Sequence, residues 1–385
     1  MYTKETQVQN EKLRLQLLSL SDPTRWDNTE AQTRASIGKY EEDDRLSRVD
    51  TVYLVGHGTS LATAMNAEFL FVRVAGVQAR AVAAYEFRTY PDYYMLHPDR
   101  TLVIGLSCSG NTESVVRCLE MARNRGALTM CISGSGDIRT AAVSDYRVCA
   151  HTEIEKESDM TAYSVSHLYI LFGALQAAML LGRKRGVLDS EQNSYWEQQW
   201  TDLKAAMRDL PVLFKTMGDV VQEYEEDDMH NVIALGTGPN YGTAQEGALK
   251  ICEFAWIFGA CEELEDFAHG RFREIDGKIP LFIIAPHANN GRKTLDLLAG
   301  CEIAHTHTYI FAEEKLPQFD NFDAQYIPMP HIKEEVLTPF LYVYPLWYFG
   351  FHYRCRQQEL VGERRFGLLA TDINYDAYLK RHENK

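Results

Sequence analysis

Three charged side chains in the second half of the sequence have types and a spacing that could serve proton transfer. Glu246, Lys250 and Glu253 lie in a segment with the apolar spacing of a helix, 243–258, and steps of four and three residues place them on one stripe. Carboxylates are common general acids and bases. The simpler interpretation is a surface ion pair, because glutamate four residues before lysine stabilises a helix by about 0.2–0.5 kcal/mol. That interpretation does not account for the acidic, non-periodic stretch after the helix.

Histidines are the second group of residues with possible chemistry. His269 comes after the helix within EDFAHGRF, where an imidazole beside Gly270 is either exposed by accident or a proton carrier that can approach a ligand. The residues alone leave both interpretations open. His305 and His307 alternate in AHTHTYIF, which predicts one face of a strand. No cysteine or carboxylate accompanies them at the spacing of a metal site, so no metal is expected.

A third group is the hydroxyl-rich stretch LSCSGNTESV, residues 106–115. It comes after an apolar run at 101–106 and precedes helical spacing from Thr112, so its hydroxyls sit where a strand turns into a helix. Unpaired N–H groups and the positive end of the helix dipole can hold an anion there, and Ser107, Ser109, Asn111 and Thr112 would add donors. An ordinary N-cap is the alternative, but one such residue suffices for a cap. The stretch favours phosphate binding.

Strand-like and helix-like runs alternate along the chain, which predicts parallel sheets covered by helices. The runs expected as strands are 51–55, 77–84, 101–106, 128–132, 146–149, 231–235 and 280–285, with long helices at 161–181 and 192–210. TVYLVGHGTS and NVIALGTGPN both read as a strand followed by G-x-G and a helix, which indicates two copies of one α/β unit. Neither copy has the third glycine of a dinucleotide motif, so a Rossmann dehydrogenase is less favoured.

Size and composition narrow the class of protein. The chain has 385 residues, 45% apolar and 24% charged, which suits two globular domains. A net charge of −15 disfavours nucleic acid and anionic membranes as partners. The eight scattered cysteines suggest neither disulfides nor zinc. With no signal peptide or membrane-spanning segment recognised, a cytoplasmic location is expected.

Four motifs in this order resemble the sugar isomerase (SIS) family: VGHGTS, LSCSGNTESV, EGALKICEF and EDFAHGRF. AYEFRTYP around Glu86 adds to the resemblance, which covers roughly residues 45–370 and is greatest to the isomerase half of glucosamine-6-phosphate synthase and to deglycases of fructosamine 6-phosphates. It implies an α/β fold with two tandem SIS-type domains, each a parallel sheet flanked by helices in flavodoxin-like or Rossmann-like layering. The domains expected are a helical segment at 1–48, SIS domains at 49–215 and 230–370, a linker at 216–229 and a tail at 371–385.

The resemblance also assigns roles to single residues. It implies that Glu253 moves a proton between sugar C1 and C2 and that His269 opens the sugar ring. It further implies that the substrate and its phosphate contact Ser60, Ser107, Cys108 through its backbone N–H, Ser109, Thr112, Glu246 and Lys250. In relatives the histidine often comes from the partner subunit, so a homodimer with a shared active site is expected. No metal or organic cofactor is expected.

The function expected is that of a phosphosugar-processing enzyme, namely a deglycase that cleaves a fructosamine 6-phosphate to a hexose 6-phosphate and an amine. Tyr2 stands where the amidotransferase has a cysteine, so glutamine-dependent synthesis is not expected. Thr371 or its neighbours stand where the synthase has its Schiff-base lysine, and a substrate that already carries nitrogen needs none. Two alternatives stay open: an aldose–ketose isomerase or aminosugar-phosphate deaminase, and a non-catalytic phosphosugar-binding regulator.

Overall fold

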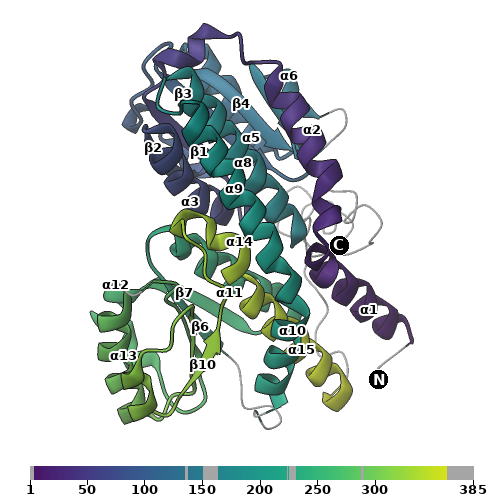
Figure 1. Cartoon of the computed structure of the whole chain (residues 1–385), viewed down its shortest axis with the longest axis vertical. Helices are drawn as coiled ribbons and strands as arrows, with labels where there is room; N and C mark the ends of the chain where they lie inside the picture. Colours follow the sequence, from purple (N-terminus) through teal and green to yellow (C-terminus); the bar gives the residue numbers. More distant parts are fainter. Residues whose placement is uncertain are drawn as a thin grey trace, which may run out of the picture.

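Two parallel sheets with the same strand order organise the protein. The computed structural model describes residues 4–134, 138–150, 164–222, 224, 231–287 and 290–361. The first five-stranded sheet has the order β2-β1-β3-β4-β5 and the second the order β10-β9-β8-β6-β7, which is the same order read from the other edge (Figure 1). The strands are β1 (Thr51–Gly56), β2 (Gln78–Ala83), β3 (Thr101–Ser107), β4 (Leu128–Ser133), β5 (Tyr146–Cys149), β6 (Asn231–Gly236), β7 (Phe258–Glu263), β8 (Leu281–Ile284), β9 (Thr308–Ala312) and β10 (Ala324–Pro328). The predicted α/β fold with two copies of one unit is therefore confirmed.

Helices cover both faces of each sheet and also fill the space between the sheets. They are α1 (Lys4–Leu18), α2 (Asp27–Gly38), α3 (Thr59–Leu70), α4 (Ala84–Thr89), α5 (Glu113–Asn124), α6 (Arg139–Ala142), α8 (Val165–Lys184), α9 (Ser190–Ala206), α10 (Leu210–Gln222), α11 (Tyr241–Ala255), α12 (Leu264–Ala268), α13 (Gly291–Ala304), α14 (Pro339–Tyr342) and α15 (Tyr344–Val361). The N-terminal segment is helical as predicted, and Asn10 of α1 donates to Gln358 of α15 at 2.6 Å. Residues 216–222, expected as linker, instead complete α10, where Met217, Val220 and Val221 are buried. The expected tail at 371–385 lies outside the described residues.

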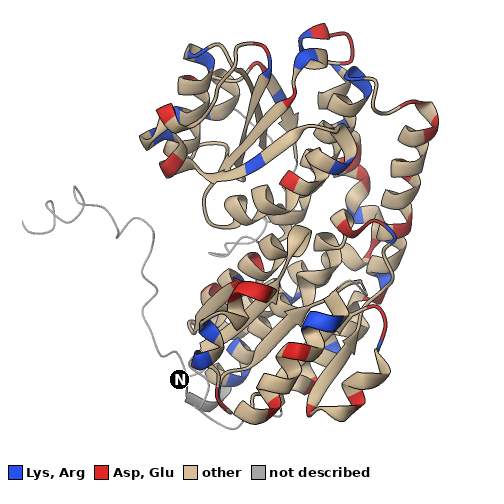
Figure 2. Cartoon of the chain, turned by 90° about the vertical axis from the view of Figure 1, so that its left-hand side faces the viewer, with Lys and Arg blue, Asp and Glu red and all other residues tan. Residues whose placement is uncertain are grey.

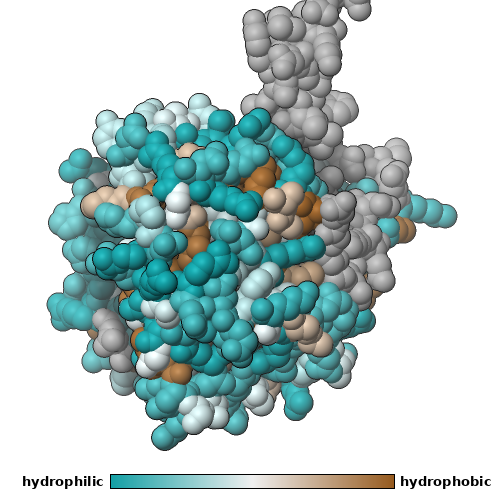
Figure 3. All heavy atoms as spheres, turned by 90° about the horizontal axis from the view of Figure 1, so that it is seen from above, coloured by the Kyte–Doolittle hydropathy of each residue, from teal (hydrophilic) through white to brown (hydrophobic). Residues whose placement is uncertain are grey.

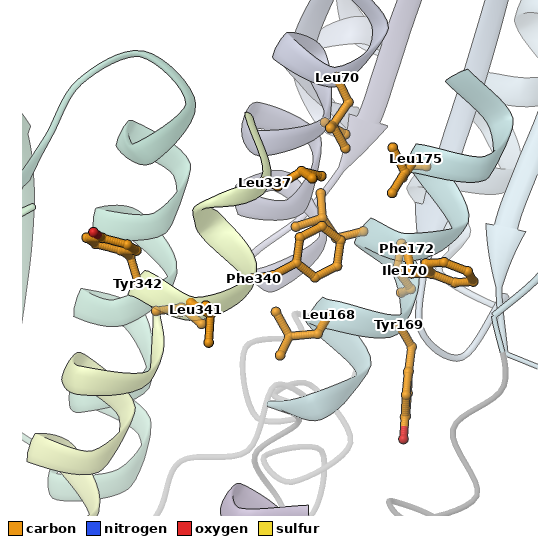
Figure 4. Close-up of a cluster of buried hydrophobic side chains, with 14 of the residues drawn as sticks. Leu70, Leu168, Tyr169, Ile170, Phe172, Leu175, Leu337, Phe340, Leu341 and Tyr342 are labelled. Atoms are coloured by element: carbon orange, nitrogen blue, oxygen red, sulfur yellow. The ribbon is translucent and has the colours of Figure 1, made fainter. Parts of the chain in front are cut away.

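Strand alternation divides the hydrophobic side chains into three layers. Leu102, Ile104 and Leu106 of β3 join the central core that both sheets share, whereas Val103 faces the outer core beneath α4 and α5. The second sheet alternates likewise: Val232 belongs to the central core and Ile233 to the outer core beneath α12 and α13. Figure 4 shows part of the central core, where Leu70 of α3 and Phe172 of α8 lie close to Phe340. One continuous core thus fixes the two sheets relative to each other.

Helix α8 is long and apolar enough to cross a membrane, judged by its length and composition alone. Val165–Lys184 has a mean hydropathy of 1.6 over its most apolar window, a stretch the sequence analysis did not recognise as long enough to span a bilayer. All of that window is buried inside the protein. The helix is apolar because it crosses the central core. The phenylalanine, tyrosine and tryptophan side chains of residues 340–353 are buried in the same core.

Two sequence interpretations differ from the structure at the edges of elements. His305 ends α13 with φ of 53° and His307 precedes β9, so the two histidines do not share a strand face. The acidic stretch after α11 forms β7, an edge strand whose residues are only partly buried or exposed. An edge strand with weak burial has little hydrophobic alternation, which explains why no strand was predicted there.

Among the charged residues that the structure describes, the buried ones are Glu246, Lys250 and Glu334. Figure 2 shows lysines and arginines interspersed with acidic residues rather than gathered into one basic surface. The face in Figure 3 is mostly hydrophilic, with small separate hydrophobic patches.

Helices α3 and α11, which come after the two G-x-G turns, pack directly on each other. A Cβ atom at Gly242 of α11 would lie 2.6 Å from the carbonyl oxygen of Ala62 and 2.9 Å from the amide nitrogen of Asn66. Asn66 of α3 in turn donates to the carbonyl oxygen of Pro239 at 2.6 Å and to the hydroxyl of Thr243 at 3.0 Å. This close contact brings the start of α3 next to the middle of α11.

Replacing Gly242 with alanine is expected to lower the free energy of unfolding by about 1–3 kcal/mol, because the added methyl group forces two backbones apart. Chemical denaturation measures the change. Gly300→Ala is the matched control: Gly300 lies in α13 with no atom within 4 Å of the place that the methyl group would take, so alanine should stabilise by about 0.5–1 kcal/mol. Equal stability of Gly242→Ala and wild type would refute this helix contact.

Candidate functional site

The carboxyl ends of β1 and β3 mark the crevice at the edge of the first sheet where the connections between strands switch from one direction to the other. β1 pairs with β2 on one side and with β3 on the other, so the connections after β1 and β3 lead to opposite edges. Ligands of open α/β sheets bind at such a switch point. The two turns at this place are 56–60, within GHGTS, and 107–112, within the hydroxyl-rich stretch. The sequence therefore folds with both of its predicted phosphate-contacting segments at one edge.

The hydroxyl-rich turn has more oxygen atoms than a helix cap uses. Thr112 is the N-cap residue of α5, yet its side chain makes no capping hydrogen bond. Its Oγ1 instead lies 3.0 Å from Oγ of Ser107, which also accepts from the N–H of Gly110 at 3.1 Å. Ser109 Oγ accepts from the N–H of Asn111 at 3.2 Å. The turn thus places several hydroxyl groups at the start of a helix, where an anion is favoured.

Cys108 and Gly110 shape the same turn. The carbonyl group of Cys108 accepts from the N–H of Gly134 at 3.1 Å, which ties the turn to the end of β4. Gly110 has φ of 65°, and a Cβ there would lie 2.7 Å from the Cβ of Ile138. A residue without a side chain is required at this position.

The GHGTS turn requires its first glycine for a similar reason. A Cβ at Gly56 would lie 2.7 Å from the carbonyl carbon of Ser60. Ser60, in the first turn of α3, donates its N–H to the carbonyl oxygen of His57 at 3.0 Å. The glycine therefore allows the helix to start directly over the strand end, with Thr59 and Ser60 at the crevice.

The charged stripe of α11 meets this turn. Lys250 Nζ lies 2.7 Å from Thr59 Oγ1, 2.8 Å from Glu253 Oε2 and 3.4 Å from Glu246 Oε1. The side chains of Lys250 and Glu246 are 1% and 0% exposed, whereas that of Glu253 is 35% exposed. A surface ion pair is therefore excluded. Glu253 is the carboxylate of the stripe that both reaches solvent and is held by a buried cation.

Burial and charge act against each other in the stripe. Burial raises the pKa of Glu246 to about 7, although the nearby ammonium group of Lys250 lowers it. Burial also opposes the charge of Lys250, but the carboxylates of Glu246 and Glu253 outweigh it and raise the pKa of Lys250. The lysine consequently stays charged, and Glu246 is the group of the stripe that gains and loses a proton near neutral pH.

Glu246 should make stability depend on pH in one direction. Its folded-state pKa of about 7 exceeds the ordinary value of 4.5, so the folded protein binds more protons between these pH values and the free energy of unfolding falls as pH rises. The slope from one such group is at most about 1 kcal/mol per pH unit. Denaturation of wild type and Glu246→Gln from pH 4.5 to 7 measures it: the variant should lack this fall. The exposed Glu120, replaced by glutamine, should behave as wild type; parallel curves for all three proteins would contradict the assignment.

His269 occupies a different place from the stripe. It ends α12 with a side chain 72% exposed, and its Nε2 lies 3.2 Å from Glu265 Oε1. Within the described part of the chain, no hydrogen bond or ion pair joins His269 to Glu253. Arg271, two residues later, pairs with Glu262 of β7 at 2.8 Å. The structure thus brings the stripe into contact with the GHGTS turn through Thr59, and leaves His269 on the surface.

Thr59 is a residue of the candidate site that the sequence analysis missed. The family motif directed attention to Ser60, yet Thr59 is the residue that contacts Lys250. Its position one residue earlier in GHGTS, at the first helical residue, was the available signal.

Comparison with known proteins finds a family match in the first half of the chain. The SIS domain family matches residues 45–178, which hold the first sheet and both of its turns. The aminotransferase named glutamine--fructose-6-phosphate aminotransferase [isomerizing] is 28% identical over 318 residues in Photorhabdus laumondii and 26% identical over 319 residues in Escherichia coli O157:H7. These alignments cover 80% of this chain and 49% of either relative, so the chain spans about half the length of the relatives that it matches.

Solved structures extend the likeness to both halves. The C-terminal domain of glucosamine-fructose-6-phosphate aminotransferase from Francisella tularensis has a TM-score of 0.77 at 19% identity, covering 90% of this chain and 95% of that one. Tagatose-6-phosphate ketose/aldose isomerase from Escherichia coli has a TM-score of 0.68 at 18% identity, covering 90% and 92%. The fold is thus that of phosphosugar isomerases. An SIS domain is found in this chain over residues 45–178.

Proposed function

We propose that this protein is a sugar-phosphate deglycase. Its substrate is a fructosamine 6-phosphate, whose phosphate is held by Ser60, Ser107, Ser109, Thr112 and the N–H of Cys108. The observation that carries the proposal is the contact of Lys250 with both Thr59 and Glu253, which holds a partly exposed carboxylate beside the GHGTS turn at the end of β1. A base fixed beside a phosphate site is what proton transfer on a phosphosugar requires.

The reaction proposed balances without a cofactor. Glu253 takes a proton from C1 of the open-chain ketosamine while O2 gains a proton from solvent, which gives an enaminol across C1 and C2. The proton held by Glu253 returns to C2 and the nitrogen loses its proton to solvent, which leaves an imine at C1. Water adds to this imine and the C–N bond breaks, which gives a hexose 6-phosphate and a free amine. Lys250 holds Glu253 in place throughout and neutralises part of its charge.

Product analysis tests the proposal. Purified protein is incubated with a small panel of fructosamine 6-phosphates, and hexose 6-phosphate, free amine and ammonia are each quantified. A deglycase releases amine and hexose 6-phosphate in equal amounts. Binding of these phosphosugars with release of neither product would overturn the proposal and favour a regulator.

A ketose–aldose isomerase or an aminosugar-phosphate deaminase is the second candidate. Structural neighbours include tagatose-6-phosphate ketose/aldose isomerase and, at a TM-score of 0.62, glucosamine-6-phosphate deaminase from Thermotoga maritima. The same stripe would serve either reaction, because each moves a proton between C1 and C2. Ammonia from glucosamine 6-phosphate, or interconversion of ketose and aldose phosphates without amine release, would identify these activities.

A homodimer with a shared active site is part of the proposal. His269 is exposed at the end of α12 and forms no contact with Glu253 in its own chain among the described residues. An imidazole that opens the sugar ring would then come from the partner subunit.

Mixing two inactive variants tests this arrangement. Glu253→Gln and His269→Ala are each expected to be inactive alone, and subunit exchange should restore part of the activity, since a mixed dimer holds one complete site. The matched control mixes Glu253→Gln with the double variant Glu253→Gln/Lys315→Met, and it should restore nothing because neither chain supplies the carboxylate. Failure of the two inactive variants to complement, with subunit exchange demonstrated, would place His269 outside the shared site.

A further inference from the structure

His167 is a buried titratable residue to which the proposed reaction assigns no role. It lies in the first turn of α8, is 0% exposed, and its Nδ1 atom is 2.8 Å from Thr63 Oγ1 of α3. Its ring faces Trp347 of α15 with centroids 6.0 Å apart. Burial and, to a lesser extent, the charge of Lys250 lower the pKa of His167 to about 3, so the imidazole is neutral at pH 7. Burying a neutral polar ring in the central core costs free energy of folding unless the ring makes a hydrogen bond.

The direction of this hydrogen bond can be derived from the threonine. A threonine hydroxyl has one hydrogen atom, and Thr63 Oγ1 donates it to the carbonyl oxygen of Thr59 at 2.8 Å. Nδ1 of His167 must therefore supply the hydrogen in its contact with Thr63. The neutral ring then carries its proton on Nδ1.

Thr59 connects this pair to the charged stripe. Its Oγ1 accepts from Lys250 Nζ at 2.7 Å, and Lys250 Nζ donates to Glu253 Oε2 at 2.8 Å. Thr59 therefore joins two sets of hydrogen bonds: its backbone carbonyl accepts from Thr63, which contacts His167, and its side chain accepts from Lys250, which donates to the proposed base. The residues come from three helices, α8, α3 and α11, and their order along these contacts is His167, Thr63, Thr59, Lys250 and Glu253.

We infer that His167 is a positioning residue: its hydrogen bond to Thr63 fixes the first turn of α3, so that Thr59 orients Lys250 and, through it, Glu253. This inference rests on the proposed function of the stripe. His167 touches no substrate in this arrangement. Its neutral form suits the position, because a second cation beside Lys250 would be repelled.

Variants that differ only in the donor test the inference. His167→Asn keeps an N–H donor near the Nδ1 position, whereas His167→Leu has none. We expect His167→Leu to lower kcat about 10- to 100-fold with little change in KM, and His167→Asn to recover most of the loss. Thr63→Val should resemble His167→Leu, and the double variant should be no worse than either. Gln176→Leu, which removes another buried polar side chain of α8, should leave kcat and KM unchanged.

The outcomes separate the two proposals. If wild type turns over and His167→Leu retains its kcat, or if His167→Asn is as impaired as His167→Leu, the positioning role is wrong. If wild type turns over none of the phosphosugars, the proposed function fails. The contact between His167 and the first turn of α3 is then tested by measuring the stability of variants. A double-mutant cycle of His167→Leu and Thr59→Val should then show non-additivity of about fivefold or more in the unfolding equilibrium constant, and additive effects would overturn it.

Discussion

Glu253→Gln is expected to lower kcat by about 10²- to 10⁴-fold while the Kd for hexose 6-phosphates stays unchanged. The glutamine side chain has the shape of glutamate and an oxygen that can still accept from Lys250 Nζ, whose distance to Glu253 Oε2 is 2.8 Å. It cannot take up a proton from carbon. Because the proposed phosphate site lies in the turns at the ends of β1 and β3, binding should not require the carboxylate.

Steady-state kinetics and calorimetric binding measure these two quantities separately. Glu120→Gln is the matched control, since Glu120 lies on the surface of α5 with a side chain 39% exposed and pairs with Arg117. It should keep wild-type kcat and Kd. Full turnover by Glu253→Gln would show that Glu253 does not carry the proton. A large loss of binding would show that the carboxylate holds the substrate rather than moving its proton.

Lys250→Met is expected to lower the free energy of unfolding by about 3–5 kcal/mol and to abolish turnover. Methionine fills a volume similar to that of the lysine stem, so the loss arises from charge: Glu246, with a side chain 0% exposed, loses the cation 3.4 Å away. Removing one partner of a buried ion pair costs this amount because the other charge stays buried without compensation. Urea denaturation at pH 8 measures it, where Glu246 is ionised in wild type.

A second substitution distinguishes charge from packing. Glu246→Gln combined with Lys250→Met removes both charges and should recover most of the stability, though not the turnover. Lys315→Met is the matched control, because Lys315 pairs with Asp320 on the surface and its loss should change stability by about 1 kcal/mol or less. If the double variant is as unstable as Lys250→Met, the cost is one of packing, and the electrostatic description of the stripe is wrong.

Local patterns predicted much of the fold because they depend on near neighbours. The strands β1, β3, β4 and β6 are buried along most of their length, as a parallel sheet covered on both faces requires. β7 escaped prediction because an edge strand is only partly buried. The linker was expected to begin at residue 216, but α10 continues to Gln222 and buries Val220 and Val221. The acidic residues that come after this helix drew the predicted boundary too early.

The part of the site that depends on local spacing was predictable as well. Glu246, Lys250 and Glu253 share a stripe by helical spacing alone, and the structure confirms that they lie together. Their burial was not predictable, because it depends on α3 packing over α11. Thr59 lies 191 residues from Lys250 in the sequence, and Thr63 lies 104 residues from His167. No periodicity connects such pairs, so only the folded structure reveals them.

The fate of the hydrogens at C1 tests the central claim most directly. A fructosamine 6-phosphate carrying two deuterium atoms at C1 is turned over, and the released hexose 6-phosphate is examined by NMR. Proton transfer by Glu253 predicts that one deuterium stays at C1 while the other moves to C2 or is lost to water. A product that keeps both deuterium atoms at C1 would mean that the C–N bond breaks without transfer between C1 and C2, and the role given to Glu253 would be wrong.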